Sequence, residues 1–565
     1  MKQKLGYLAL FAAAGVLSIS AQVRTGTLEK KEPDSRRVEL PSSPGPQSPA
    51  QQTPVLPKID LPEYIITGVA SFSQSDVNKE EVEARSLAVD VGQYRTSTGP
   101  RERNTVEFES RQKEFLSSNS LVQNGQVRAS LGNYFTPRVN FWFGQLEKDY
   151  DYRVEAGYRR TKGFAANTDQ SSGNFGLGGG VSFLSGALQG GRLVGDAGWR
   201  TESYRFYGST TPTAERKHTN SQFGLSVLGS PKGDFQWKAN LGYRFDTIGD
   251  NAVETNQSRV VFGAMSEYPV LGTPIQARVS YQSATLSGAN SGTTSLFSGS
   301  LSTSRIWWSS FFAQLSGQFS STIGMGNQSL IRLYPELTFG LQINSYHRAT
   351  VSYGGGVSYL DLANAIQTAP YLGSNAQIRN GDRQHRGSIV VESDWNSILR
   401  TTTSVSYERV NDLALLVDPA GIGIFQLFYG GATELWNFRT ESFAKLTPND
   451  YVTATLSINA SKNSMTQLSV PYLPDFELIG SYTHRFPVGI AVVPNLRYLD
   501  TREVGFLASQ QLPGYLLVGL QAEYEPISTV RLIIEIENML DKRYELWKGY
   551  QGAPFLVSGG LSFRW

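Results

Sequence analysis

Residues that could perform acid–base, nucleophilic or metal chemistry are few in this sequence. The chain contains no cysteine, which excludes disulfide scaffolds, thiolate zinc sites, thiol catalysis and a lipid anchor on cysteine. Of its four histidines, His218 and His385 fall in predicted loops, His347 starts a predicted strand and His484 lies on one. None stands near a nucleophile motif, so we predict no enzyme activity, no cofactor and no resident metal. Metal capture by His218 and His385 is the alternative.

Charge in the sequence is sparse and balanced. The 565 residues include 51 Lys and Arg against 49 Asp and Glu, a formal net charge of +2, and only 18% of residues are charged. Nucleic-acid-binding proteins usually gather an excess of Lys and Arg on one face, so we expect no nucleic-acid partner. So little charge beside 12% aromatic residues is unusual for a soluble enzyme, and it indicates that part of the surface meets lipid.

From about residue 126 to the C-terminus, apolar and polar residues alternate in long segments. The pattern is clear in 152–159, 235–246 and 331–343. Successive side chains of a strand point to opposite faces, so each segment has one apolar and one polar face. A tilted membrane strand needs about 9–11 residues, whereas strands of soluble sandwiches are mostly about five or six. We therefore predict an all-β protein, an antiparallel transmembrane β-barrel with outer-membrane lipid as its partner.

The sequence contains about 22 such segments, the number expected of a large outer-membrane barrel. They begin near residues 126, 138, 150, 173, 191, 218, 235, 257, 273, 294, 306, 330, 347, 386, 399, 420, 450, 475, 489, 514, 529 and 555. The connections alternate between short ones, such as 147–149, and long ones, such as 361–385. An even strand number puts both barrel ends in the periplasm and the long loops outside.

The polar faces of these segments would line the lumen. The charged residues assigned to them are Arg153, Glu155, Arg159, Lys238, Arg244, Arg278, Arg332, Glu336, Glu392, Asp394, Arg531, Glu535 and Glu537. They could tune permeation or hold a plug, or they could form ladders of opposite charge that only stabilise the wall. Their signs are mixed, whereas selective pores usually carry rings of one sign.

Aromatic residues gather near the predicted segment ends, where membrane interfaces belong. They are Tyr134, Phe135, Trp199, Trp307, Trp308, Tyr524 and Trp565. The last segment also alternates up to a terminal aromatic residue, as in outer-membrane proteins recognised by the barrel-insertion machinery. This predicted insertion signal comprises Phe555, Val557, Leu561, Phe563 and Trp565. Four aromatic residues of the long loops could stack on a sugar or hydrophobic ligand, or pack the loops on themselves: Tyr371, Tyr472, Trp547 and Tyr550.

The N-terminus has the three-part pattern of a secretory signal peptide, predicted over residues 1–21. A basic start is followed by the apolar run 5–19 and by small residues that allow cleavage after Ser20 or Ala21. Residues 22–60 are rich in Pro, Ser and Gln, which predicts a flexible linker. The mature chain would therefore be exported and reach the bacterial outer membrane.

Three motifs resemble the TonB-dependent receptor family. The stretch 537–545 (ENMLDKRYE) is similar to the family's "NLFDKRY" element, and 127–138 resembles its first barrel hairpin. Ile65-Ile66-Thr67-Gly68 is similar to the "VVTG" run that opens the family's plug domain. The resemblance implies a plugged barrel of 22 strands, a receptor function and a TonB-like periplasmic partner.

The sequence departs from that family between the opening run and the first strand. Only 69–125 lie there, without the plug's recurring Gly- and Arg-containing motifs, so we expect the plug in segment 61–125 to be reduced or absent. The run Pro62, Glu63, Tyr64, Ile65, Ile66, Thr67 and Gly68 could be an energy-coupling strand, a strand added to a periplasmic partner, or a leftover extended segment. The barrel itself is assigned to 126–565.

Two functions are compatible with these features. The first is a receptor or transport conduit for a small solute across the outer membrane. The alternative is a structural or scaffold barrel that binds periplasmic or surface partners and conducts nothing, because an open lumen of this width would leak.

Overall fold

The computed structural model of the protein describes residues 124–565 except 148, 187, 230–234, 252, 325–328, 345, 396–397 and 506–509, and omits the side chain of Leu146. The predicted signal peptide, the Pro-rich linker, the run Pro62–Gly68 and the rest of the segment up to residue 123 lie outside the described residues. Among the residues that are described, no helix is both long and apolar enough to cross a bilayer.

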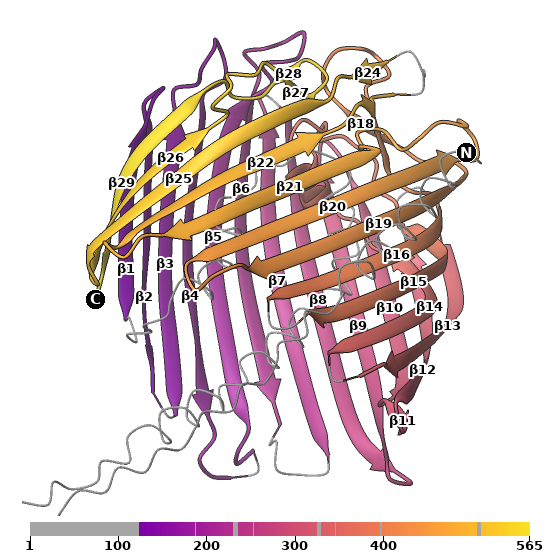
Figure 1. The fold of residues 1–565 in the computed structure, drawn as a ribbon. Coiled ribbons are helices and arrows are strands. Elements are labelled where there is room, and N and C mark those ends of the chain that lie inside the picture. Colours follow the sequence, from indigo (N-terminus) through magenta and orange to yellow (C-terminus); the bar gives the residue numbers. More distant parts are fainter. Residues whose placement is uncertain are drawn as a thin grey trace, which may run out of the picture. The chain divides into compact units, whose positions relative to one another are not determined.

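Twenty-two antiparallel strands form one closed sheet (Figure 1). The first ten are β1 (Gly125–Gly132), β2 (Thr136–Leu146), β3 (Tyr150–Thr161), β4 (Gln170–Ser182), β5 (Arg192–Arg205), β6 (Glu215–Leu228), β7 (Gln236–Asp250), β8 (Val253–Val270), β9 (Thr273–Gly288) and β10 (Gly292–Thr303). The next six are β12 (Phe311–Ile323), β13 (Ser329–Gln342), β14 (His347–Ser358), β15 (Gly381–Trp395), β16 (Leu399–Asn411) and β19 (Ala432–Lys445). The last six are β20 (Asp450–Asn463), β21 (Phe476–Arg485), β22 (Ile490–Leu499), β25 (Tyr515–Ile527), β26 (Val530–Glu537) and β29 (Leu556–Arg564).

The ring is closed by pairing between its first and last strands, β1 and β29. Their register runs from Gln126 opposite Arg564 to Gly132 opposite Ser558. A short additional strand, β11 (Ile306–Trp308), pairs with the beginning of β12. Closure leaves no unpaired sheet edge, which is the condition for strands to cross a bilayer.

The outer face of the ring is apolar, as the alternation predicts. On β13, Ile331, Leu333 and Phe339 are 68%, 74% and 54% exposed, whereas Tyr334 on the opposite face is 4% exposed. No second sheet covers these outward side chains within the described chain. Apolar surface on this scale is stable only against lipid, so the wall spans a membrane.

The two ends of the barrel differ in their connections. At the end that holds the start of β1 and the end of β29, turns are short; the β8–β9 turn consists of Leu271 and Gly272, both at positive φ. We call the opposite end, where the long connections lie, the outer end. Its loops contain the helix α6 (Leu362–Thr368) and the hairpins β17 (Leu415–Val417)–β18 (Gln426–Phe428), β23 (Arg502–Glu503)–β24 (Gln511–Leu512) and β27 (Glu545–Trp547)–β28 (Tyr550–Gln551).

Several sequence-based placements need correction. The strand expected from about 420 begins at Ala432, because the apolar stretch before it folds as the β17–β18 hairpin of a loop and not as wall. His218 and His385, expected in loops, lie on β6 and β15, since these strands begin earlier than the alternation indicates. Trp199, expected near a strand end, lies in the middle of β5.

The main packed core of the described chain lies among the outer loops. Its buried residues, which we call the cap cluster, come from strand ends and loops and are Ile248, Leu286, Leu360, Leu362, Ala365, Ile366, Ala369, Leu372, Ala376, Ile378, Leu416, Phe425, Tyr472, Val504, Leu512, Trp547 and Tyr550. Most of these residues belong to the loops, and Ile248 and Leu286 join them from the ends of wall strands.

Candidate functional site

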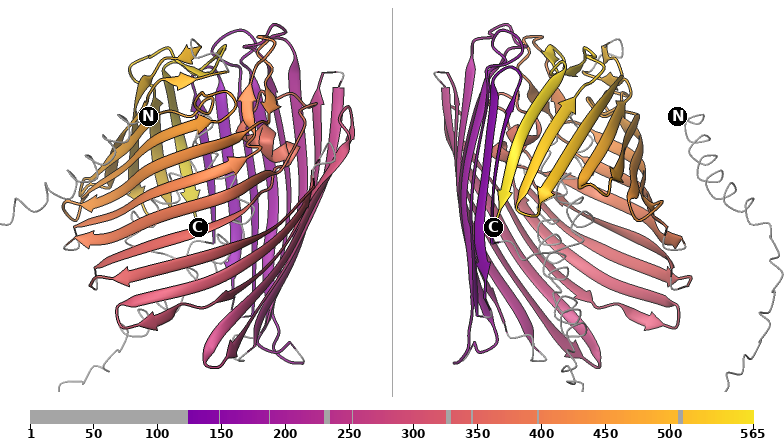
Figure 2. Two further views of the ribbon diagram at one scale, coloured as in Figure 1. Left: turned by 90° about the vertical axis from the view of Figure 1, so that its right-hand side faces the viewer. Right: turned by 60° about the vertical axis from the view of Figure 1, so that its left-hand side comes forward.

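The connection between β14 and β15, residues 359–380, folds into the ring and is called here the lumen segment. Figures 1 and 2 both place its helix α6 inside the ring of strands near the outer end. Asp361 caps this helix by accepting a hydrogen bond from the Asn364 backbone N–H at 2.9 Å. Leu362 and Ile366 of the helix are 0% and 2% exposed within the cap cluster. The segment therefore has its own local structure and its own apolar contacts.

The start of the lumen segment is held on β8 by a buried polar network. Arg259 Nη1 lies 3.1 Å from Asp361 Oδ2, and Gln257 Nε2 donates to Asp361 Oδ1 at 3.2 Å. The Ala363 backbone N–H donates back to Gln257 Oε1 at 3.2 Å. Because Asp361 is 1% exposed, its charge is stable only with these partners.

A second network holds the end of α6 and the turn after it. Arg216 of β6 is fully buried and forms a two-pronged ion pair with Asp250 of β7, with both distances at 2.6 Å. Its third nitrogen, Nη1, donates to the Pro370 carbonyl at 2.8 Å. Tyr204 of β5 donates to the same carbonyl at 2.7 Å, and the Ser374 N–H donates to Asp250 at 3.2 Å. Three side chains of the wall, those of Arg216, Tyr204 and Asp250, thus converge on Pro370 and Ser374.

The loop aromatic residues pack on one another. Tyr371 and Tyr550 stack with ring centroids 3.5 Å apart, and Phe425 lies 5.8 Å from Trp547 and 5.7 Å from Tyr472. The Tyr550 hydroxyl donates to the Gly423 carbonyl at 2.6 Å, joining two loops. Burial raises the pKa of Tyr371 well above its usual value, so this phenol stays neutral. The sequence left two interpretations of these residues open, stacking on a ligand or packing of the loops on themselves. The structure shows loop packing.

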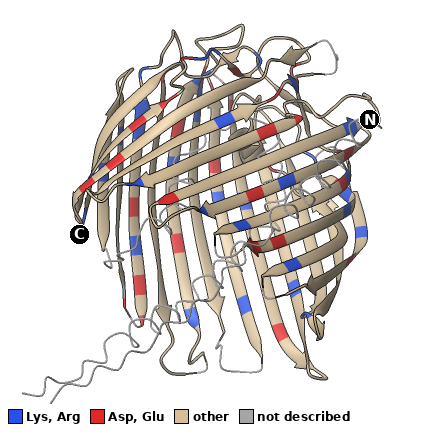
Figure 3. Cartoon of the chain, in the orientation of Figure 1, with Lys and Arg blue, Asp and Glu red and all other residues tan. Residues whose placement is uncertain are grey.

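Most of the charged residues predicted for the lumen form ion pairs. Arg153 pairs with Glu155, Arg244 with Asp246, Arg332 with Asp382, Glu392 with Arg348, Asp394 with Arg400, Arg531 with Glu523, and Glu535 with Arg128. Arg159, Lys238, Arg278, Glu336 and Glu537 lie on β3, β7, β9, β13 and β26. Figure 3 shows the two signs intermingled along the strands. Some pairs join residues two apart on the same strand, such as Arg153 with Glu155. From the sequence, we expected only pairs between neighbouring strands.

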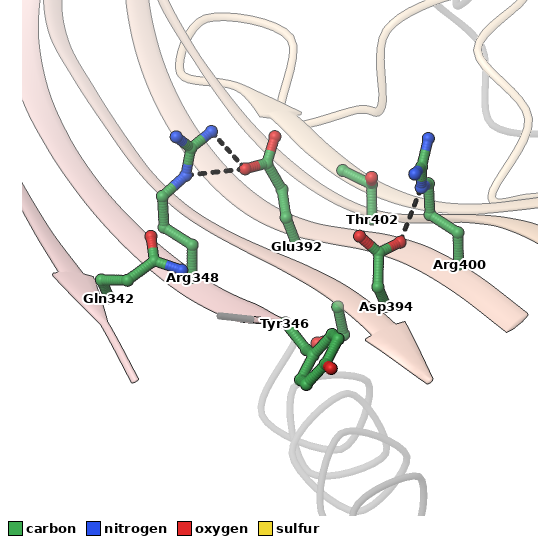
Figure 4. A pocket seen from close by; sticks show the side chains of 8 residues that line it. Gln342, Tyr346, Arg348, Glu392, Asp394, Arg400 and Thr402 are labelled. Carbon is green, nitrogen blue, oxygen red and sulfur yellow. Dashed lines mark hydrogen bonds and ion pairs between the residues drawn. The ribbon is translucent and has the colours of Figure 1, made fainter. Parts of the chain in front are cut away.

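A polar hollow lies near the short-turn end of β13–β16 (Figure 4). Two ion pairs line it, Arg348 with Glu392 and Arg400 with Asp394, the latter at 2.6 Å. Arg400 is 70% exposed, so these charges are largely solvated and either pair contributes little to stability. The remaining lining residues are Gln342, Tyr346, Ser393 and Thr402.

The histidines do not assemble into a centre. His218 Nε2 lies 2.8 Å from buried Asp246, whereas His385 Nδ1 bonds the Tyr353 hydroxyl at 2.8 Å on strands that do not neighbour β6. Within the described part of 124–565, no group of three or more His, Asp or Glu side chains is placed to hold a metal ion. These contacts are those of structural polar groups in a wall.

Sequence reasoning did not find the residues that hold the lumen segment: Arg216, Asp250, Gln257, Arg259 and Asp361. One local signal was present, because Asp361 followed by an apolar run and Asn364 is a helix N-terminal pattern. Nothing local indicates that this helix lies inside the ring.

A closed antiparallel ring of 22 strands with an apolar outer face defines a transmembrane β-barrel of the outer-membrane class. No protein-family model matches the sequence, and no curated protein matches it. Solved structures do match: the FrpB iron transporter from Neisseria meningitidis (F5-1 variant) aligns with a TM-score of 0.64 and 11% identity, covering 79% of this chain and 83% of that one.

Two further structures are similar. The copper transporter OprC aligns with a TM-score of 0.61 and 11% identity over 78% of this chain and 80% of its own. The siderophore receptor PiuA from Acinetobacter baumannii aligns with a TM-score of 0.59 and 10% identity over 78% and 82%. These neighbours are TonB-dependent receptors, so the predicted resemblance to that family is confirmed at the level of the fold.

Proposed function

We propose that this protein is an outer-membrane receptor that conducts a small solute through its lumen. The observation that carries the proposal is the outer end of the barrel, where the lumen segment and the cap cluster cover a ring of 22 strands. Rings of this size have a lumen that must be filled to prevent leakage. The structural neighbours named as iron and copper transporters and as a siderophore receptor support a transport function for this fold.

The remaining parts of the chain are assigned to the same function. We infer that residues 1–21 direct export, that 22–60 tether the barrel, and that 61–125 are a reduced plug or the vestige of one. Pro62–Gly68 would add a strand to a TonB-like periplasmic protein, since main-chain pairing needs only an extended segment. The C-terminal residues Phe555 to Trp565 would be recognised by the barrel-insertion machinery.

A non-transporting scaffold is the second candidate function. It is favoured by the depth of closure at the outer end, where Phe425, Tyr550 and Leu362 are all 0% exposed. A scaffold would use this packed outer end as a binding surface and would not need to open.

Uptake measurements in cells separate the two. Cells with and without the gene are given labelled ferric ion, cupric ion or a ferric siderophore, and accumulation is compared. We expect the protein to raise accumulation of at least one probe, and removal of 62–68 to abolish the increase if transport is energy-coupled. Unchanged accumulation of every probe, with the folded barrel present in the outer membrane, would favour the scaffold.

A further inference from the structure

We infer that the lumen segment, residues 359–380, plugs the lumen at the outer end of the barrel and leaves this position when a solute passes. The passage of a solute rests on the proposed function, whereas the role of the segment as a barrier does not. The inference assigns closure of the lumen at this end to a loop between two wall strands.

The contacts of the lumen segment place it inside the ring. Its partners on the wall are Arg216, Asp250, Gln257 and Arg259, on three consecutive strands, β6 to β8. Ile248 of β7 and Leu286 of β9 belong to the same buried cluster as its apolar residues and are 0% and 5% exposed. Ile248 shares the inward face of β7 with Asp246 and Asp250, because side chains alternate along a strand.

The lumen segment extends along a large part of the ring. Beyond β8, Asn290 Nδ2 donates to the Ala376 carbonyl at 2.8 Å, and Asn380 bonds Thr322 of β12. The contacts of the segment thus extend from β5 and β6 to β12, along the inner face of seven wall strands. A segment placed this way blocks access to the wall beneath it.

The lumen segment can move without damage to the wall. The β14–β15 ladder ends at the pair Ser358 and Gly381, the two residues that flank the segment. No ladder hydrogen bond of the ring is made by the residues between them. When the segment leaves, water can replace the lost contacts of Arg259 and Asp361, and the Arg216–Asp250 pair joins two wall strands and does not depend on the segment. The segment is therefore a unit with defined ends.

The outer loops over the lumen segment supply the rest of the closure. Tyr371 of the segment stacks on Tyr550, and Leu372 forms a bridge with Phe425. Both partners belong to other outer loops, so displacement of the segment also loosens the cap cluster. The closure is consequently cooperative across three loops.

Cysteine accessibility tests the barrier, because the natural chain has no cysteine. A single Ile248→Cys reports from the inner wall beneath the segment, and Thr213→Cys, exposed in the loop 206–214, is the matched control. Intact cells are treated with a membrane-impermeant maleimide. We expect slow labelling at 248 and fast labelling at 213 in the full-length protein.

Replacing 362–376 by a short Gly-Ser linker should raise the labelling rate at 248 to near that at 213. Asp361→Ala, which removes the cap of α6 and the partner of Arg259, should raise it about tenfold or more. Asp418→Asn, a carboxylate bonded only to N–H groups of its own loop among the contacts described, should change little. Leu286→Cys serves as a second reporter if Ile248→Cys does not assemble.

Folding is checked by resistance of the unheated barrel to detergent. If a folded barrel lacking 362–376 stays protected at 248, or if the unaltered segment already permits fast labelling, the inference is wrong. Fast labelling without uptake of any probe would leave the plug assignment standing and would overturn the proposed function.

A reversible crosslink tests the movement. Thr255 Oγ1 lies 3.4 Å from the Ser374 carbonyl, so Thr255→Cys with Ser374→Cys should hold the segment on β8. Uptake should fall when the pair is oxidised and recover on reduction, and each single variant should be unaffected. Uptake that persists with the crosslink fully formed would show a fixed constriction, against the inference.

Discussion

At the scale of single residues, the outer end depends on charges and phenols removed from water. Arg216 and Asp361 are almost fully buried, and each forms an ion pair: Arg216 with Asp250, and Asp361 with Arg259. A charge that stays buried after losing its partner is costly, so these ion pairs favour one arrangement of the loops. The phenol of Tyr550 adds a hydrogen bond between loops that are far apart in sequence.

Tyr550 offers a graded test of that packing. Tyr550→Phe removes one hydrogen bond and should reduce the stability of the cap cluster by about 1 kcal/mol. Tyr550→Ala also removes the ring stacked on Tyr371 and should cost about 3–5 kcal/mol. Hydrogen exchange of the amides in 412–431 and 538–555 measures both. Equal protection in the two variants would show that the ring does not stabilise the loops.

At the scale of elements, the closing seam joins strands from the two ends of the barrel. Arg128 of β1 reaches across β29 to Glu535 of β26 at 2.5 Å, and both residues are 8% exposed. At the short-turn end the Trp565 ring occupies the space beside Gly125, where a Cβ would overlap it. Side chains and ladder pairs therefore act together at the seam.

Glu535→Gln tests the ion pair of the seam. The variant keeps the shape but leaves the guanidinium of Arg128 facing a neutral amide, which should destabilise the folded barrel by about 3 kcal/mol. The measurement is the urea midpoint of the barrel refolded in lipid vesicles. Glu155→Gln is the control, because its partner Arg153 is 66% exposed and the pair is worth about 1 kcal/mol or less.

The last strand carries a second prediction at this scale. Gly125→Val should displace the Trp565 ring and lower the fraction of assembled barrel, and removal of Trp565 should lower it further if the terminal aromatic residue is the insertion signal. Detergent-resistant protein in outer-membrane fractions reports both. Normal assembly without Trp565 would assign the signal to the preceding residues Phe563 and Leu561.

At the scale of the whole molecule, the two faces of the ring meet different solvents. Leu337 and Thr338 are neighbours on β13, yet Leu337 shares the outward face with Leu333 and Phe339 whereas Thr338 points inward. A charge placed on the lipid face must be desolvated, and a charge placed on the inner face need not be.

Arginine substitutions at Leu337 and Thr338 test whether the wall spans a membrane. Leu337→Arg should destabilise the barrel in vesicles by about 2–4 kcal/mol, whereas Thr338→Arg should cost less than about 1 kcal/mol. Urea unfolding in lipid vesicles measures both. Equal costs for the two variants would contradict a lipid-covered outer face.

The sequence by itself determined the wall. Alternation with period two, segment length and connection length are local properties, so the number of strands and most of their starting points could be predicted from them. The error at 420–431 has the same origin, since an apolar run that packs into a loop cluster has the same local pattern as one that faces lipid.

Only the tertiary structure decided what closes the outer end of the barrel. Loops have no repeating pattern, and the contacts that place them join residues far apart, such as Asp361 with Arg259 and Tyr550 with Tyr371. Such contacts form because the closed ring brings eleven outer connections to one rim, where their apolar residues can be buried only against each other. That condition belongs to the ring as a whole, and no segment of the sequence carries it alone.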